Sequence, residues 1–189
     1  MRPSVYCTIG PFFPAAFSEG TSDLTQNNGQ TARGQHIVLA GRVLELDGAP
    51  TLNTILEIWQ ADSGGVFRHS LDPRCPQADP GFFGWGRART DKDGWYRFRT
   101  VLPGAYENRV PHVNVMVLAI GLTRRLVTTA FFSDRPEAAS DPVLDCVSDP
   151  AARLRLFARR DASLDAGGAL GYRFDLILRG EGETPFFRD

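Results

Sequence analysis

The stretch TDKDGWYRFRTV, residues 90–101, decides how this chain folds. Its aromatic residues Tyr96 and Phe98 alternate with arginines, which is the period-two pattern of a strand with one buried face. The DKDG segment at 91–94 supplies the turn residues of a hairpin, and residues 85–90 supply its other strand. This is the clearest hairpin that the sequence predicts, and it indicates a fold built from strands.

Similar patterns predict further strands, separated by turns rich in Gly, Pro and Asp. Ser148, as cap, and Pro150 predict the start of one short amphipathic helix that reaches about Arg160. We therefore expect an all-β fold, an antiparallel β-sandwich of about seven to eight strands with one short helix and an irregular N-terminal arm. The further strands are expected at 37–43, 54–60, 113–119, 126–132 and 172–179.

Length and composition predict one soluble domain. The chain has 189 residues, of which 42% are hydrophobic and 23% charged, close to the averages of globular proteins, so a disordered chain is excluded. Residues 1–34 show no periodicity and are expected to form an arm that lies against another surface. Residues 35–189 are expected to form the sandwich.

Charge and cysteine usage exclude several functional classes. The net charge is −1 and no basic run of five or more occurs, so nucleic acid is not an expected partner. No apolar window reaches the length of a signal peptide or a membrane span, and no membrane association is expected. Cys7, Cys75 and Cys146 are odd in number and lack CxxC spacing, which argues against a disulfide framework and a structural zinc site. A cytoplasmic location is expected.

One window carries the candidate chemistry. In LPGAYENRVPHVNV, Tyr106 lies six residues before His112, and His112 shares a strand face with Asn114. A phenolate and an imidazole that converge there could hold a hard ferric ion. Alternatively, His112 hydrogen-bonds within the fold and Tyr106 packs at a loop edge. His69 is expected to be a solvated loop histidine and His36 a structural one.

Several motifs together resemble one enzyme family. They match in order, over nearly the whole chain, those of the α-type subunits of protocatechuate 3,4-dioxygenase, within the intradiol ring-cleaving dioxygenases. The closing RGEGET-FF pattern is typical of α-type chains. The matching motifs are TIGPFF (8–13), LEIWQAD (56–62), TDKDGWYRFRTVLPGAY (90–106), PHVNV (111–115) and YRFDLILRGEGETPFF (172–187).

The resemblance implies that this chain has lost its own iron centre. Iron-bearing members hold Fe(3+) with two tyrosines and two histidines, whose positions fall here on Phe67, Tyr106, His112 and Asn114. Phenylalanine has no donor atom, and a neutral asparagine oxygen is a much weaker ligand for ferric iron than imidazole. These are vestigial metal-ligand positions, and we expect no metal and no catalytic residue in this chain.

The resemblance also implies a partner. Similar α-type chains pair with a homologous β-type chain that binds the iron, and the complex cleaves protocatechuate with O2 to 3-carboxy-cis,cis-muconate in aromatic-compound catabolism. In such complexes the N-terminal arm of the α-type chain lines the partner's substrate pocket. The resemblance therefore implies that residues of this chain's arm form part of that pocket's wall. The alternative is that the arm packs only on the partner's surface and does not reach the pocket. The expected wall residues are Thr8, Gly10, Pro11 and Phe12.

Three questions stay open in the sequence. Ile120 occupies a position where α-type chains carry an arginine that faces an anionic substrate, and Arg124 or Arg125 could supply that positive field instead. Aromatic residues gather at both termini and could bury against a partner or against this chain's own sandwich. Finally, the chain could be a stand-alone, non-catalytic scaffold or binding module, or an independent metalloenzyme that uses Tyr106, His112 and His69.

Overall fold

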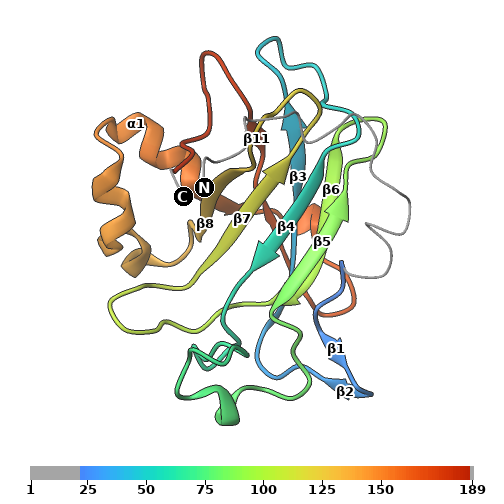
Figure 1. The fold of residues 1–189 in the computed structure, drawn as a ribbon, viewed down its shortest axis with the longest axis vertical. Helices are drawn as coiled ribbons and strands as arrows, with labels where there is room; N and C mark the ends of the chain where they lie inside the picture. Colours follow the sequence, from blue (N-terminus) through green and yellow to red (C-terminus); the bar gives the residue numbers. More distant parts are fainter. Residues whose placement is uncertain (1–21, 188–189) are drawn as a thin grey trace, which may run out of the picture.

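Short strands joined by turns and 3-10 helices make up residues 22–187, the part of the chain that the computed structural model describes (Figure 1). The strands are β1 (Gln26–Asn27), β2 (Gln30–Thr31), β3 (His36–Leu44), β4 (Ile55–Trp59), β5 (Trp85–Arg89), β6 (Trp95–Val101), β7 (His112–Leu118), β8 (Leu126–Phe132), β9 (Phe157–Arg160), β10 (Leu170–Arg173) and β11 (Leu176–Ile177). The helical elements are η2 (Cys75–Gln77), η3 (Pro136–Ser140), η4 (Pro142–Cys146), α1 (Pro150–Arg153), η5 (Leu154–Leu156) and η6 (Ala162–Leu164).

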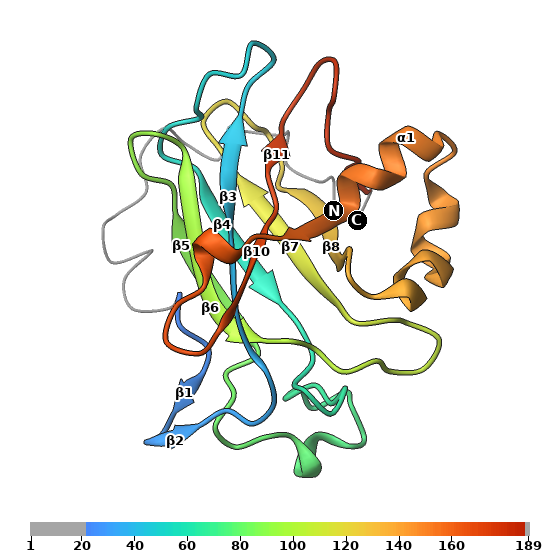
Figure 2. The ribbon, with the colours of Figure 1, turned by 180° about the vertical axis from the view of Figure 1, so that it is seen from behind.

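The strands form two layers around one core. One layer has the order β5-β4-β7-β8, and the other has β6-β3-β10-β9, with β11 following β10 along β3 (Figure 2). Alternate residues of both layers are buried in a common hydrophobic cluster, within which the Phe132 and Tyr172 rings meet edge to face at 4.9 Å. Each such side chain contributes about 1.5–3 kcal/mol on burial. The expected all-β sandwich is confirmed. The hairpin predicted over residues 85–101 is wrong, because β5 pairs with β4 and β6 pairs with β3, so the turn at 91–94 leads from one layer to the other.

The purely antiparallel pairing that the sequence predicted is only partly right. β10 and β11 run parallel to β3, and β9 runs parallel to β8, where Phe131 and Phe132 face Phe157 and Ala158. Parallel neighbours need a long crossover connection. Here residues 133–156, which contain η3, η4, α1 and η5, carry the chain from the end of β8 back to the start of β9.

The predicted helix is right through Leu156, where η5 continues α1, and wrong for residues 157–160. Asp149, not Ser148, caps α1, with its carboxylate accepting from the Ala151 N–H at 2.9 Å. α1 ends at Arg153, and residues 157–160 form β9 because they find strand partners in β8 and β10. Pairing between segments distant in sequence overrides the local helical pattern.

The predicted last strand, 172–179, is broken into β10 and β11. Between them, the Phe174 N–H donates to the Ala40 carbonyl and the Asp175 carboxylate accepts from the Arg42 N–H. Gly41 lies under this break, where an added Cβ would come within 1.9 Å of the Phe174 carbonyl oxygen. The close approach of the two backbones therefore requires a glycine.

The described part of the predicted arm, residues 22–34, lies on this chain's own sandwich. Leu24 is fully buried, and its N–H donates to the Arg99 carbonyl at 2.8 Å. β1 and β2 pair around Asn28 and Gly29, both at positive φ, as two-residue hairpin loops require. No strand was predicted in this segment. Packing of the arm on a partner chain stays a prediction, since residues 1–21 lie outside the described part.

The two C-terminal phenylalanines pack in part on this chain's own sandwich, one of the two alternatives that the sequence left open. Phe186 packs on the main core, and Phe187 packs on a second cluster that includes Phe131 and Leu156. The N-terminal aromatics lie outside the described residues. No helix within residues 22–187 is long and apolar enough to span a membrane.

Candidate functional site

A pocket of about 560 Å³ opens at the end of the sandwich where β4 ends and β7 begins. The loop of residues 60–84 and the loop between β6 and β7 supply most of its lining, and β4 and β7 supply Trp59 and Asn114. Its lining is mostly aromatic: the Trp59 and Phe67 rings meet at 5.4 Å, and Phe67 and Tyr106 meet edge to face at 4.9 Å. We call it the aromatic pocket, and its main lining residues are Trp59, Phe67, His69, Arg74, Tyr106 and Asn114.

Two aspartates shape the loop that carries Phe67. The buried Asp62 carboxylate accepts from the backbone N–H groups of Gly64, Val66 and Asp79 at 2.8–3.0 Å. The Asp72 carboxylate accepts from the Phe67 N–H at 3.0 Å. These bonds satisfy backbone N–H groups that have no strand partner in this irregular segment. Asp62 lies in the LEIWQAD motif, but the motif alone did not reveal this organising role.

Tyr106 and His112 are bonded to each other. The Tyr106 hydroxyl lies 3.2 Å from His112 Nε2, and His112 Nδ1 lies 2.7 Å from the Val110 carbonyl oxygen. Because a carbonyl can only accept, Nδ1 carries the proton and Nε2 accepts from the hydroxyl. Burial raises the pKa of the Tyr106 phenol and lowers the pKa of the His112 imidazole. Both shifts favour the neutral forms at pH 7.

The buried Asp141 carboxylate holds the loop that precedes β7. It accepts twice from Arg109 Nε, at 2.9 and 3.0 Å, and from the Val110 N–H at 3.1 Å. The Tyr106 and Arg109 backbones also bond to each other. Asp141 was not predicted as a site residue, because nothing in the sequence signals its pairing with Arg109, which lies 32 residues earlier.

The structure brings all four vestigial positions to one place. Phe67, Tyr106 and Asn114 line the aromatic pocket, and His112 lies behind Tyr106 with only 2% of its surface exposed. The expected grouping of these positions, which the resemblance implied, is therefore present in space. Two of the four side chains bring no strong donor for ferric iron.

The residues present do not fit the ferric iron that the iron-bearing chains of the resembled family hold. The phenol and imidazole that remain satisfy each other, and ligation would require both to give up that bond. Neutral Tyr106 would also have to lose a proton against its raised pKa. Within residues 22–187, no group of three or more His, Cys, Asp or Glu side chains could hold a metal ion.

The other histidines have local partners. The His36 ring, through Nε2, bonds to the Ala32 carbonyl at 2.8 Å, in keeping with the expected structural role. His69 is exposed, accepts from the Leu71 N–H at Nδ1 and meets the Trp59 ring edge on at 5.8 Å. His69 therefore lies at the pocket rim, although the sequence predicted only a solvated loop.

The remaining predicted site residues lie elsewhere. Arg124 and Arg125 belong to the turn that follows β7, whereas the pocket residue Asn114 lies near the start of that strand. The seven residues of β7 span roughly 20 Å, so neither arginine faces this chain's own pocket. A role toward a partner's substrate stays a prediction. Thr8, Gly10, Pro11 and Phe12 lie outside the described residues.

The loop that carries Phe67 should respond to acid. Hydrogen bonds from the Phe67 and Arg74 N–H groups and the Arg74 side chain lower the pKa of Asp72 from 3.8 to about 2. A lowered pKa means that the stabilisation is complete above about pH 4 and is lost as the pH falls toward 2. The difference in free energy of unfolding between wild type and Asp72→Asn should be constant near neutral pH and should shrink below about pH 4. Urea denaturation at several pH values checks this, and a constant difference down to about pH 2.5 would contradict it.

Comparisons with known proteins show the family to which this chain belongs. The family model described as Dioxygenase matches residues 8–180. The β chain of protocatechuate 3,4-dioxygenase from Burkholderia cepacia is 41% identical over 179 residues, which cover 88% of this chain and 74% of that protein. The α chain from the same organism is 36% identical over 192 residues, 95% of this chain and 94% of that one. The α chain from Pseudomonas putida is 35% identical, covering 82% and 77%.

Solved structures share the fold. The dioxygenase domain of a dioxygenase and carbohydrate-binding fusion from Streptomyces sp. SirexAA-E superposes with a TM-score of 0.63 at 26% identity, covering 95% of this chain and 99% of that one. For 3-chlorocatechol 1,2-dioxygenase from Rhodococcus opacus 1CP, the TM-score is 0.63 at 20% identity, covering 92% and 71%. With its family match over most of its length, this chain belongs to the intradiol ring-cleavage dioxygenases, and its relatives include subunits of protocatechuate 3,4-dioxygenase.

Proposed function

We propose that this chain is the α-type subunit of a ferric protocatechuate 3,4-dioxygenase of the cytoplasm. A homologous β-type chain holds Fe(3+), and the complex cleaves protocatechuate with O2 to 3-carboxy-cis,cis-muconate in aromatic-compound catabolism. This chain completes the partner's pocket and the interface between the two subunits.

The donor set of the aromatic pocket carries this proposal. A chain whose remaining phenol and imidazole bond to each other, beside a phenylalanine and an asparagine, offers no four-ligand site for iron. The chemistry must then take place at a centre that another chain provides. The relatives that match most of this chain include both α and β chains of one enzyme.

Length and identity point to different relatives, and the donor positions support the assignment to the α type. This chain is 41% identical to a β chain but covers only 74% of it, whereas it covers 94% of the α chain from the same organism. Overall identity reflects the shared sandwich, while metal binding depends on a few side chains. The substitutions at Phe67 and Asn114 therefore favour the α-type role.

Co-expression tests the proposal. This chain is produced alone and together with a homologue that keeps both tyrosines and the H-x-H pair. We expect a coloured complex that contains both chains and consumes O2 on protocatechuate. A monomeric, colourless chain that ignores such a partner would favour the stand-alone, non-catalytic scaffold. Stoichiometric ferric binding with tyrosinate colour by this chain alone would contradict the iron-free role.

The arm is tested within the same complex. If Phe12 lines the partner's pocket, Phe12→Ala should raise KM or lower kcat while the two chains still co-purify. Phe17→Ala, an arm aromatic outside the TIGPFF motif, is the matched control. Equal kinetics for the two variants would favour packing on the partner's surface alone.

A further inference from the structure

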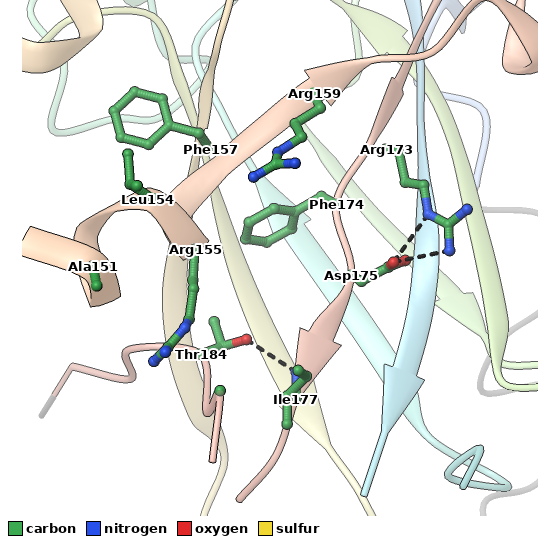
Figure 3. A pocket seen from close by; sticks show the side chains of 11 residues that line it. Ala151, Leu154, Arg155, Phe157, Arg159, Arg173, Phe174, Asp175, Ile177 and Thr184 are labelled. Carbon is green, nitrogen blue, oxygen red and sulfur yellow. Dashed lines mark hydrogen bonds and ion pairs between the residues drawn. The ribbon is translucent and has the colours of Figure 1, made fainter. Parts of the chain in front are cut away.

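A second hollow, of about 490 Å³, lies on a part of the chain that the proposed function does not use (Figure 3). Its walls come from the α1–η5 segment, from β9, from the broken β10–β11 edge and from residues 182–184. It shares no lining residue with the aromatic pocket. We call it the basic pocket, and its main lining residues are Arg155, Phe157, Arg159, Arg173, Phe174 and Thr184.

The lining of the basic pocket has an excess of positive charge. Arg155, Arg159 and Arg173 line it together with a single carboxylate, that of Asp175. Asp175 pairs with Arg173 at 2.9 Å through both Nε and an Nη atom, so it neutralises only that arginine. The Arg155 side chain reaches a main-chain carbonyl, that of Glu183, which leaves its charge uncompensated. Two net positive charges therefore remain in the wall.

The strand register concentrates this charge. Arg159 on β9 stands directly opposite Arg173 on β10, so both side chains leave the same face of the sheet. Like charges in directly opposite positions destabilise a sheet unless a counter-charge lies between or beside them. Within residues 22–187 the Arg159 guanidinium has no hydrogen-bond or ion-pair partner, whereas Arg173 has Asp175. Figure 3 shows the unpaired Arg159 among the other pocket residues.

The floor of the basic pocket is apolar. Phe157, Phe174 and Ile177 line it between the arginines. One buried hydroxyl completes the lining: Thr184, only 1% exposed, accepts from the Ile177 N–H at 3.0 Å and keeps its own proton for a further acceptor. Flat apolar walls beside guanidinium groups match a ligand that joins a ring to an anionic group.

We propose that the basic pocket binds a small aromatic carboxylate, with the carboxylate on Arg159 and Arg155 and the ring against Phe157 and Phe174. Arginine binds a carboxylate through two parallel N–H bonds, and aromatic rings add offset or edge contacts. A bound anion also gives Arg159 a counter-charge, which no residue within 22–187 supplies, whereas Arg173 has Asp175. The site does not depend on iron or on a partner chain.

Titration of the full chain with benzoate tests the proposal. Calorimetry and the amide NMR shifts of the chain measure the binding. We expect saturable binding, with shifts centred on Phe157, Arg159 and Phe174. Benzamide keeps the ring and removes the charge, and should bind at least about tenfold more weakly. Cyclohexanecarboxylate keeps the charge and removes the π-system, and should bind a few-fold more weakly. Inorganic phosphate, which lacks an apolar body, should bind more weakly than benzoate.

Variants locate the site. Arg159→Gln should weaken benzoate binding about tenfold or more, because a charge-assisted pair is lost. Arg33→Gln removes an arginine that is 73% exposed and lies outside the basic pocket, and should leave binding unchanged. Equal affinity in wild type and Arg159→Gln, or shifts confined to the aromatic pocket, would overturn the proposal. So would phosphate binding that equals or exceeds benzoate binding.

Discussion

The double variant Phe67→Tyr/Asn114→His should bind ferric iron and turn coloured, where the wild-type chain does not. Both positions already line the aromatic pocket beside Tyr106 and His112. Loss of a residue that merely supports a ligand costs 10–100-fold in metal affinity. Two restored ligands should therefore raise the affinity for ferric iron by about 10²-fold to 10⁴-fold or more. Visible absorption from tyrosinate-to-iron charge transfer and metal analysis after dialysis measure the gain.

The reason for this expectation is geometric. Asn114 lies two residues after His112 on β7, so a histidine there leaves the same face of the strand. A hydroxyl on the Phe67 ring would lie beside Tyr106, whose ring is 4.9 Å away. With a metal present, the Tyr106 proton is replaced and the bond to His112 Nε2 is given up for ligation.

A matched control variant tests whether the place of the added histidine matters, or only its presence. Phe67→Tyr/Met116→His adds the same two groups, but places the histidine one strand repeat further from His112, where Met116 lines a different pocket. It should bind ferric iron no better than Phe67→Tyr alone. Equal iron binding by the two double variants would show that the four positions do not form a preserved site.

Asp141→Ala should be the most destabilising substitution near the aromatic pocket. The Asp141 side chain is fully buried and accepts from Arg109, Val110 and Val143. Removing one partner of a buried ion pair costs about 3–5 kcal/mol, because the other charge stays buried without compensation. For a chain of this size that corresponds to a fall in Tm of roughly 6–20 °C. Thermal and urea unfolding measure the effect.

Asp145→Ala is the control for this prediction. The Asp145 side chain is 84% exposed and meets Arg153 at 3.9 Å, so its loss should change stability by no more than about 0.5 kcal/mol. Asp141→Asn keeps an acceptor but loses the charge, and should fall between the two. Similar melting temperatures for Asp141→Ala and Asp145→Ala would refute the role of Asp141 in holding the loop before β7.

The limits of sequence reasoning are visible at particular residues. Strands β3 to β8 follow from alternation, because side chains on successive residues point to opposite faces. Residues 157–160 carry the same kinds of side chain as the predicted helix before them, and only their contacts with β8 and β10 make them a strand. The Asn28-Gly29 turn was readable, but it lay in a segment without periodicity.

The sequence by itself determined the sandwich, the family resemblance and the loss of donors at Phe67 and Asn114, since each depends on residue identity or local spacing. Only the tertiary structure decided that Tyr106 and His112 bond to each other, that Asp141 holds their loop and that Arg159 opposes Arg173. The role of Asp141 and the opposition of the two arginines depend on residues that are not neighbours in the sequence. The first depends on how a loop folds back onto a strand, which no pattern of neighbouring residues encodes.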